Sequence, residues 1–335
     1  MRRFRTTALA AALALAACGS PHAATVALPT PSAAWAEFRH LPGVVDLAGP
    51  RSDGSFLVAA AGRLFVLGRD GALSPFARGA GGYQTATGPE PYLVIVNGVP
   101  VQGDHCAFPR DAAFAIEPGT RPAVIMISPA GRARPFASLP PGSALTGIAF
   151  DATGRFGHKL LVTAGLRGGT TVFAIGCDGR LSLVMTDGPQ VEGGIMVAPA
   201  TFGAFGGDLI APNETSGRVY AVSPSGKVVI LARSGLPAGG DIGVESAGFA
   251  PASAAAAYLA DRFSRGNKHP GDDAVLRLPA AGLARAGIRA GDLLVATEGG
   301  AKTIDVRCAA TCAVRYVATG PAIAHAEGHI VFSSS

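Results

Sequence analysis

A recurring strand–turn–strand unit constrains the fold of this chain more than any other feature of its sequence. Each copy has an apolar strand, a turn with a glycine and a second apolar strand; the copies begin at Val66, Met126, Ala174 and Ala221. The turn glycines, which can adopt the positive φ of a tight hairpin, are Gly71, Gly131, Gly179 and Gly226. The repeat therefore predicts many antiparallel strands joined by short turns.

Two more apolar segments precede most of these hairpins. The nearer one begins at Ser55, Lys159, Asp208, Ala257 and Asp292, and the farther one at Val44, Gly147, Gly194 and Ala247. Four strands in about 50 residues are typical of a β-propeller blade. Tandem β-sandwich domains would also contain many strands, but they would not repeat the same four-strand order about every 50 residues. The 46 glycines and 25 prolines favour turns over helices. We therefore predict an all-β fold, a β-propeller, with at most one short helical turn near Ala280.

The repeat predicts six four-stranded blades, with five or seven as alternatives. Complete units start near Val44, Glu90, Leu145, Glu192 and Glu245. The sixth would combine strands near residues 292–297, 302–308 and 313–319 with the last strand, from Gly328. Propellers commonly close by pairing strands from both ends of the chain, and residues 34–41 could supply that partner.

The N-terminal segment has the pattern of an export signal. Arg2, Arg3 and Arg5 precede an apolar run over residues 8–17, and Cys18 follows small residues. The stretch Leu15-Ala16-Ala17-Cys18 resembles a bacterial lipobox, which implies that Cys18 is lipidated and the preceding peptide removed. An ordinary signal peptide is the alternative. We predict a lipoprotein signal peptide (1–17), a lipidated N-terminus and tether (18–37) and a propeller domain (38–335), exported and lipid-anchored to the bacterial cell membrane, facing outside the cytoplasm.

Charge gives no indication of a nucleic-acid partner. The chain has 28 basic and 23 acidic residues, and removing residues 1–17 takes away three arginines, which leaves 25 − 23 = +2. The remaining charges are scattered rather than grouped in a basic patch. We expect a monomer that contacts the membrane through its lipid and binds a small molecule, a polysaccharide or a protein.

Four cysteines remain beside Cys18, and an exported chain favours disulfides for them. Cys308 and Cys312 are close enough to close their own turn, which would leave Cys106 to pair with Cys177. Four cysteines allow three connectivities, and the spacing is not that of a zinc site.

A glutamate recurs at the start of the predicted innermost strands, which face the central channel. The copies are Glu192, Glu245 and Glu327, with Glu90 as a fourth, whereas Leu145 breaks the pattern. Converging carboxylates suit Ca²⁺, which takes 6–8 oxygen ligands. They could instead raise the pKa of one carboxyl for acid–base catalysis, or simply cap their strands.

Four further residues are candidates at the channel. His325, Glu327 and His329 would share one face of a strand, and two histidines with a carboxylate suit a transition metal, although packing is the alternative. Asp241 could orient a ligand at the channel mouth, and Asn213 follows a second-position strand. Turn chemistry explains both equally well.

The hairpin glycines and the sequences of residues 207–213 and 216–226 carry a resemblance to a known class. Over roughly residues 40–332, the chain resembles the NHL and gluconolactonase-like propeller class. That class includes calcium-dependent lactonases, lyases and non-enzymatic scaffolds. The resemblance implies a role as metal ligand for Glu192, Glu245 and Glu327 alone. Two functions follow as hypotheses: a surface-anchored binding propeller, with or without a structural Ca²⁺, or a metal-dependent hydrolase (lactonase-like) or lyase acting on a small envelope metabolite. A quinone-cofactor dehydrogenase is a third, less supported alternative.

Overall fold

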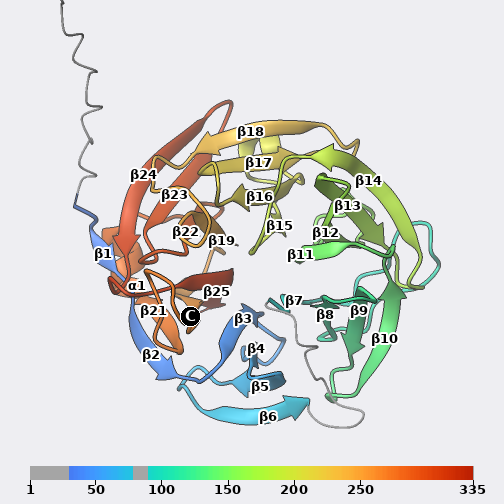
Figure 1. Ribbon diagram of the computed structural model, residues 1–335, viewed down its shortest axis with the longest axis horizontal. Coiled ribbons are helices and arrows are strands. Elements are labelled where there is room, and N and C mark those ends of the chain that lie inside the picture. The colour runs from blue at the N-terminus through green and yellow to red at the C-terminus, as the bar shows by residue number, and fades with distance from the viewer. Residues whose placement is uncertain (1–29, 78–89, 335) are drawn as a thin grey trace, which may run out of the picture.

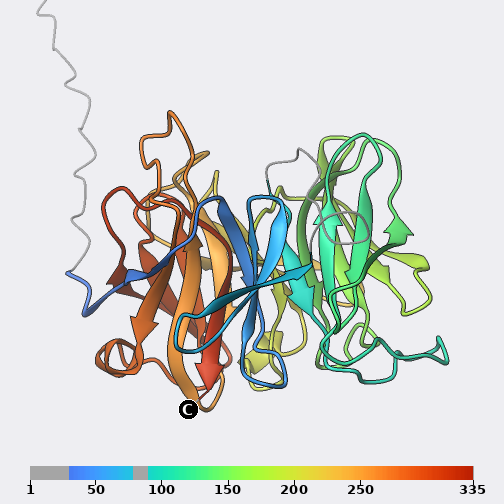
Figure 2. The ribbon, with the colours of Figure 1, turned by 90° about the horizontal axis from the view of Figure 1, so that it is seen from below.

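The protein is an all-β propeller, as predicted. The computed structural model describes residues 30–77 and 90–334, so Cys18, the predicted signal peptide and most of the predicted tether lie outside the described residues. Sheets radiate from a central axis like spokes (Figure 1), and most strands run along that axis in the side view (Figure 2). In the described part of the chain, no helix is long and apolar enough to cross a bilayer.

Four sheets have four strands each, and in each the chain runs from the axis outwards. The first contains β3 (Val44–Ala48), β4 (Phe56–Ala60), β5 (Arg63–Leu67) and β6 (Leu73–Ala77). The second contains β7 (Leu93–Ile95), β8 (Ala113–Glu117), β9 (Ala123–Ile127) and β10 (Ala133–Ser138). The third contains β11 (Ala144–Phe150), β12 (Leu160–Leu166), β13 (Gly169–Ile175) and β14 (Leu181–Gly188). The fourth contains β15 (Met196–Val197), β16 (Leu209–Asn213), β17 (Arg218–Val222) and β18 (Val228–Arg233), with a short 3₁₀ helix at Gly203–Phe205.

The remaining strands form one sheet of nine. Its order is β1 (Ala33–Ala34), β24 (Cys312–Thr319), β23 (Thr303–Cys308), β22 (Leu293–Thr297), β19 (Val244–Phe249), β25 (Ala326–Ser334), β20 (Ala254–Asp261), β21 (Ala274–Pro279) and β2 (Ala36–His40). One short helix, α1 (Ala280–Arg285), follows β21 where the sequence predicts a helical turn.

The sheet count corrects the prediction of six separate four-stranded blades: four such sheets are present, and the other nine strands are joined. The join is a single parallel pair between β19 and β25, at Ala247 and His329. The backbones of β19 and β25 approach each other and Gly194, which precedes β15, closely at this point. Gly194 permits this because it has no side chain: a Cβ at that position would overlap the carbonyl oxygen of Gly328.

The predicted strand pairing in the last units is also wrong. The strands of residues 292–319 pair with β19, whereas the last strand, β25, inserts beside β20. The repeat could not specify this, because β22 and β25 are both apolar segments of suitable length to lie next to β19 or β20. The N-terminal strands close the ring as predicted: β2 pairs with β21 and β1 with β24.

The turns of the repeat are as predicted. Gly71, Gly131, Gly179 and Gly226 each connect the third and fourth strands of a four-stranded sheet with φ between 79° and 83°. The core lies between neighbouring sheets; for example, Leu161 and Val172 of one sheet belong to the same buried cluster as Leu209 and Tyr220 of the next. Strands inside a sheet, such as β12, are therefore largely buried on both faces, whereas the outer strand β14 leaves several of its side chains exposed.

Both predicted disulfides are present. Cys106 pairs with Cys177, 71 residues away, and Cys308 pairs with Cys312 across the turn between β23 and β24. The first links a loop of the second sheet to the hairpin turn of the third. It therefore ties two neighbouring sheets together at their periphery.

A buried ion pair lies on the propeller axis. His329 of β25 contacts Asp46 of β3 through Nδ1 (3.0 Å), and its Nε2 lies 3.1 Å from the carbonyl oxygens of Ile148 and Ile195. Both ring nitrogens thus face acceptors, which requires the imidazolium form. Burial opposes this charge, but Asp46 and the two carbonyl groups outweigh it and raise the pKa of His329. Asp46 also accepts backbone N–H bonds from Leu93 and His329.

Replacing Asp46 by Asn should destabilise the fold by about 3 kcal/mol, because it leaves the His329 cation buried without its counter-charge. Chemical denaturation at pH 6 measures the change in the free energy of unfolding. Asp187→Asn is the matched control, since Asp187 is an exposed residue near the end of β14 with φ of 54°, which Asn tolerates well. Equal stability of the two variants would contradict a central role for the pair.

Candidate functional site

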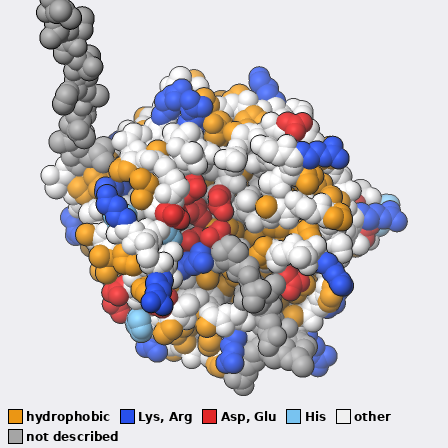
Figure 3. Space-filling model, viewed as in Figure 1, with side chains coloured by type: hydrophobic (Ala, Val, Ile, Leu, Met, Phe, Trp, Pro, Cys, Tyr) orange, Lys and Arg blue, Asp and Glu red, His pale blue; other side chains and the backbone are white. Residues whose placement is uncertain are grey.

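One mouth of the central channel is strongly acidic. A group of red side chains fills the centre of the face seen in Figure 3. The carboxylates come from the starts of inner strands and from nearby loops; they are Glu90, Glu192, Glu214, Glu245, Glu298 and Glu327. They gather here because inner strands of different sheets begin at the same end of the axis. We call this set of six the acidic mouth.

Glu245 and Glu327 lie at the centre of the acidic mouth and are almost completely buried. The buried Tyr92 hydroxyl joins them: it donates to Glu245 Oε1 at 2.5 Å and lies 3.1 Å from Glu327 Oε2. Burial, reinforced by the charge of Glu327, raises the pKa of Glu245 well above its usual range. This shift favours the protonated form of Glu245 unless a cation compensates its charge.

Two cations pair with one side of the acidic mouth. Arg262 Nη1 donates to Glu90 Oε1 (3.0 Å) and to Glu327 Oε1 (2.9 Å). His325 Nε2 lies 3.2 Å from Glu298 Oε1 and 3.3 Å from Glu327 Oε1. Burial opposes protonation of His325, but these two carboxylates outweigh it and raise its pKa to about 10. Burial likewise disfavours the Glu327 anion, yet His325 and Arg262 hold the pKa of Glu327 below its usual value.

Carboxylates elsewhere in the mouth contact one another. Burial and the adjoining Glu90 raise the pKa of Glu192 to about 9. Burial and a contact with Glu298 raise the pKa of Glu214 to about 8. The backbone N–H of Asp241 donates to Glu214 Oε2 (3.1 Å) and partly offsets this rise. The mouth thus has more carboxylates than the two cations can neutralise.

Two sets of three carboxylates share Glu245. In one set, oxygens of Glu90, Glu245 and Glu327 lie within 4.8 Å of one another, and Arg262 already occupies that side. In the other, oxygens of Glu214, Glu245 and Glu298 lie within the same limit. Glu298 Oε2 is buried and has no hydrogen-bond partner within the described residues. The second set therefore has the oxygen donors that a hard cation requires, and His325 beside Glu298 is the one cation that contacts it within the described residues.

The structure brings the four predicted glutamates to one channel mouth, with Glu192 beside Glu90 rather than in either set of three. His325 joins them. His329 does not: Gly328, with φ of 64°, interrupts the alternation of β25, and His329 lies deeper on the axis with Asp46. The predicted arrangement of two histidines and a carboxylate on one face is therefore wrong.

Asn213 and Asp241 have local roles. The Asn213 amide donates to the carbonyl oxygen of Gln190, and its Oδ1 accepts the backbone N–H of Ser216, which fixes a turn. The exposed Asp241 side chain lies outside the sets of three, although its backbone supports Glu214.

Four residues of the site were not predicted from the sequence: Tyr92, Arg262, Glu214 and Glu298. Glu214 and Glu298 each follow a second-position strand, β16 and β22. A glutamate just after an apolar strand in two units was a signal that could have been recognised. Arg262 and Tyr92 had no such signal.

Comparison with known proteins identifies similar folds only. No family model matches the chain, and no curated protein matches its sequence. Among solved structures, a streptogramin B lyase is 12% identical over 84% of this chain and 72% of its own, with a TM-score of 0.45. Virginiamycin B lyase from Staphylococcus aureus is 12% identical over 84% and 88%, with a TM-score of 0.43. A gluconolactonase from Xanthomonas campestris is 15% identical over 68% and 69%, also with a TM-score of 0.43. No functional conclusion follows from similarities of this size.

The raised pKa of Glu192 predicts a pH-dependent stability. A carboxyl whose pKa is higher in the folded state contributes stability below its unfolded value, near 4.5, and loses it as pH rises through the folded value, about 9. The melting temperature, measured in EDTA, should therefore fall as the pH is raised from 5 to 9. Glu192→Gln, which stays neutral, should show a smaller fall.

Glu37→Gln, an exposed position on β2, is the control and should follow the wild-type pH profile. Identical profiles for all three proteins would show that Glu192 titrates normally.

Proposed function

We propose that the acidic mouth binds a divalent cation, Ca²⁺ by its chemistry, and that the propeller uses this centre to bind a small oxygen-bearing ligand. The observation that carries the proposal is the set of Glu214, Glu245 and Glu298, whose carboxylate oxygens converge within 4.8 Å. Removing these charges from water is costly unless protons or a cation compensate them. A bound divalent ion would provide that compensation at neutral pH.

The donor set fits Ca²⁺ better than a transition metal. Three carboxylates can supply three to six hard oxygen ligands, and Ca²⁺ takes 6–8. The imidazole in the mouth, that of His325, is held as a cation between Glu298 and Glu327, so its Nε2 is not a free ligand. The remaining positions around the ion would accept water or ligand oxygens.

The proposed site differs in part from the one expected from the repeat. Glu245 is common to both, but Arg262 and His325 pair with Glu90 and Glu327 and reduce the need for an ion there. We therefore assign Glu214 and Glu298 as the other ligands. Glu90 and Glu192 border an adjoining hollow lined also by Ser143 and Thr146, where part of a bound molecule could lie.

The outer contacts of this mouth suit a ligand with carboxylate, carbonyl or hydroxyl groups. Oxygen atoms of these groups complete the coordination of Ca²⁺. Arg262, which is about a fifth exposed, could donate to the same molecule. Export and lipid anchoring through Cys18 remain part of the proposal, because they rest on the N-terminal sequence pattern alone; they would place this binding centre outside the cytoplasm.

Calcium should raise the melting temperature of the protein, and EDTA should reverse the rise. Glu298→Gln removes one charged ligand and should weaken Ca²⁺ binding by at least about tenfold, since charge count sets the affinity of such sites. Titration calorimetry and thermal melts measure both effects. Glu37→Gln should behave as wild type. No Ca²⁺ binding at millimolar concentrations would overturn the proposal.

A hydrolase or lyase is the second candidate, and one observation favours it. Glu192 lies at the entrance with its pKa raised to about 9 by burial and by Glu90, so it is protonated at neutral pH. A protonated carboxyl beside a bound substrate can act as a general acid. When present, the ion would polarise a carbonyl oxygen of a lactone or ester.

An activity screen distinguishes catalysis from binding. If the site is catalytic, a panel of lactones and esters should include a substrate whose hydrolysis requires Ca²⁺, and Glu192→Gln should lower kcat by about 10²-fold or more. The same variant should keep its Ca²⁺ affinity, because Glu192 lies outside the proposed ligand set. Ligand binding without turnover of any compound in the panel would favour the non-catalytic function.

A further inference from the structure

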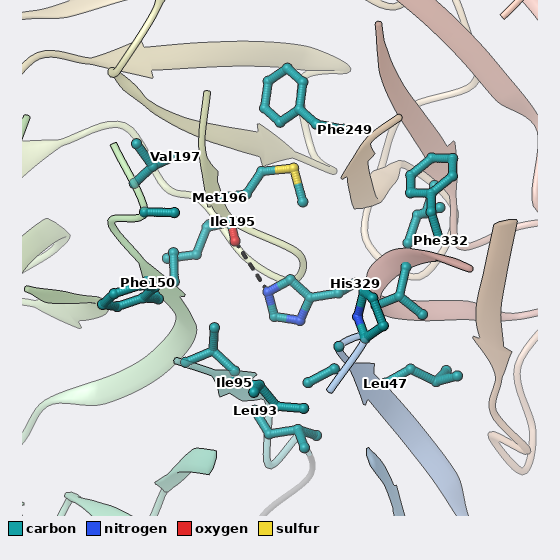
Figure 4. Close-up of a pocket in the computed structure, with 18 of the residues that line it drawn as sticks. Leu47, Leu93, Ile95, Phe150, Ile195, Met196, Val197, Phe249, His329 and Phe332 are labelled. Atoms are coloured by element: carbon teal, nitrogen blue, oxygen red, sulfur yellow. Dashed lines mark hydrogen bonds between the residues drawn. The ribbon is translucent and has the colours of Figure 1, made fainter. Parts of the chain in front are cut away.

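The opposite end of the channel contains an apolar cavity. Its volume is about 380 Å³, within the usual range for small-molecule sites. Figure 4 shows side chains from several inner strands converging around it, with His329 beside them. Those that line it include Leu47, Ile95, Phe150, Val197, Phe249 and Phe332.

Strand direction places this cavity away from the acidic mouth. Along β25, Glu327 lies at the acidic mouth, His329 on the axis and Phe332 at the cavity. Glu245 and Phe249 lie in the same way at the two ends of β19. Each strand residue advances about 3.3 Å, so roughly 15 Å separates the two ends. The two ends of the channel are therefore distinct sites.

The axial ion pair closes the inner end of the cavity. His329 extends between Asp46 and the carbonyl oxygens of Ile148 and Ile195, which come from three different sheets. Gly194 and Gly328 bring two further backbones into contact beside it. The cavity is therefore blind, and a ligand can enter it from one side alone.

The lining contains no polar side chain that could anchor a charged group. Apart from Gly49 and His329, every lining residue has an apolar side chain. Both ring nitrogens of His329 are already engaged with protein acceptors. A charged or strongly polar group entering here would lose its hydration without replacement, whereas a hydrocarbon surface would gain by leaving water.

We propose that this blind cavity binds a neutral apolar small molecule, one rich in alkyl or aromatic groups. Its concave shape suits a compact molecule better than the flat surface of a second protein. The half-buried rim side chains of Met196 and Phe249 provide a polarisable thioether and an aromatic ring for such contacts. This site does not depend on the ion or on the function proposed for the acidic mouth.

The neutral fluorescent probe N-phenyl-1-naphthylamine tests the proposal on the soluble protein. Wild type should bind one probe saturably at micromolar concentration. Val197→Trp fills the cavity and should weaken binding at least tenfold. Ile230→Trp, which adds the same indole at an exposed position of β18, should leave binding unchanged. Melting temperatures confirm that each variant is folded.

A second variant covers the case in which Val197→Trp does not fold. Met196→Glu places a carboxylate at the partly exposed rim and should weaken binding of the neutral probe by a similar factor. No saturable binding by wild type, or equal binding by the folded cavity variants, overturns the proposal. So does a dimer that forms through this face without binding the probe, as measured by light scattering. Probe binding should be the same in Ca²⁺ and in EDTA, which separates this test from that of the acidic mouth.

Discussion

The structure depends on one buried charge pair at the propeller axis. His329 carries a proton because Asp46 and two backbone carbonyl groups surround its ring, and Asp46 in turn accepts backbone N–H groups from two other strands. Sheets that radiate from an axis leave backbone groups of their inner strands facing inward. Here one ionised pair satisfies several of these groups at once. A hydrocarbon side chain of similar size would leave them unpaired, which carries a free-energy cost for each buried group.

The same pair divides the channel into two chemically different ends. At the acidic mouth, six carboxylates face two cations, so protons or a metal ion must balance the remaining negative charge. Below it, the walls are almost entirely apolar. Strand direction produces this contrast: the starts of the inner strands are polar and their ends are apolar, so residues of each kind accumulate at opposite ends.

The sequence predicted the parts of the fold that repeat. The hairpin glycines, the strand order within four sheets and the Cys308–Cys312 disulfide are encoded locally or by regular spacing. The Cys106–Cys177 disulfide followed by elimination, and the closure by residues 34–41 followed from the usual way in which propellers close. The pairing of β19 with β22 and of β25 with β20 was not predictable, because β22 and β25 are both apolar segments that could lie beside β19 or β20. In the site, recurring glutamates were found at the inner strands. Arg262 and Tyr92 were missed because each occurs once, and their role appears only when distant strands meet.

The closure of the ring has a consequence for how the chain reaches this state. Strands β1 and β2 pair with β24 and β21, and the axial strand β25 is the last strand in the described sequence. During synthesis, the first strands must wait for partners made more than 200 residues later, with their edges exposed in the meantime. The central pair cannot form before β25 has been made, and β25 is synthesised after every other described strand. The ring therefore cannot close, and its centre cannot be filled, until the last described strand is available.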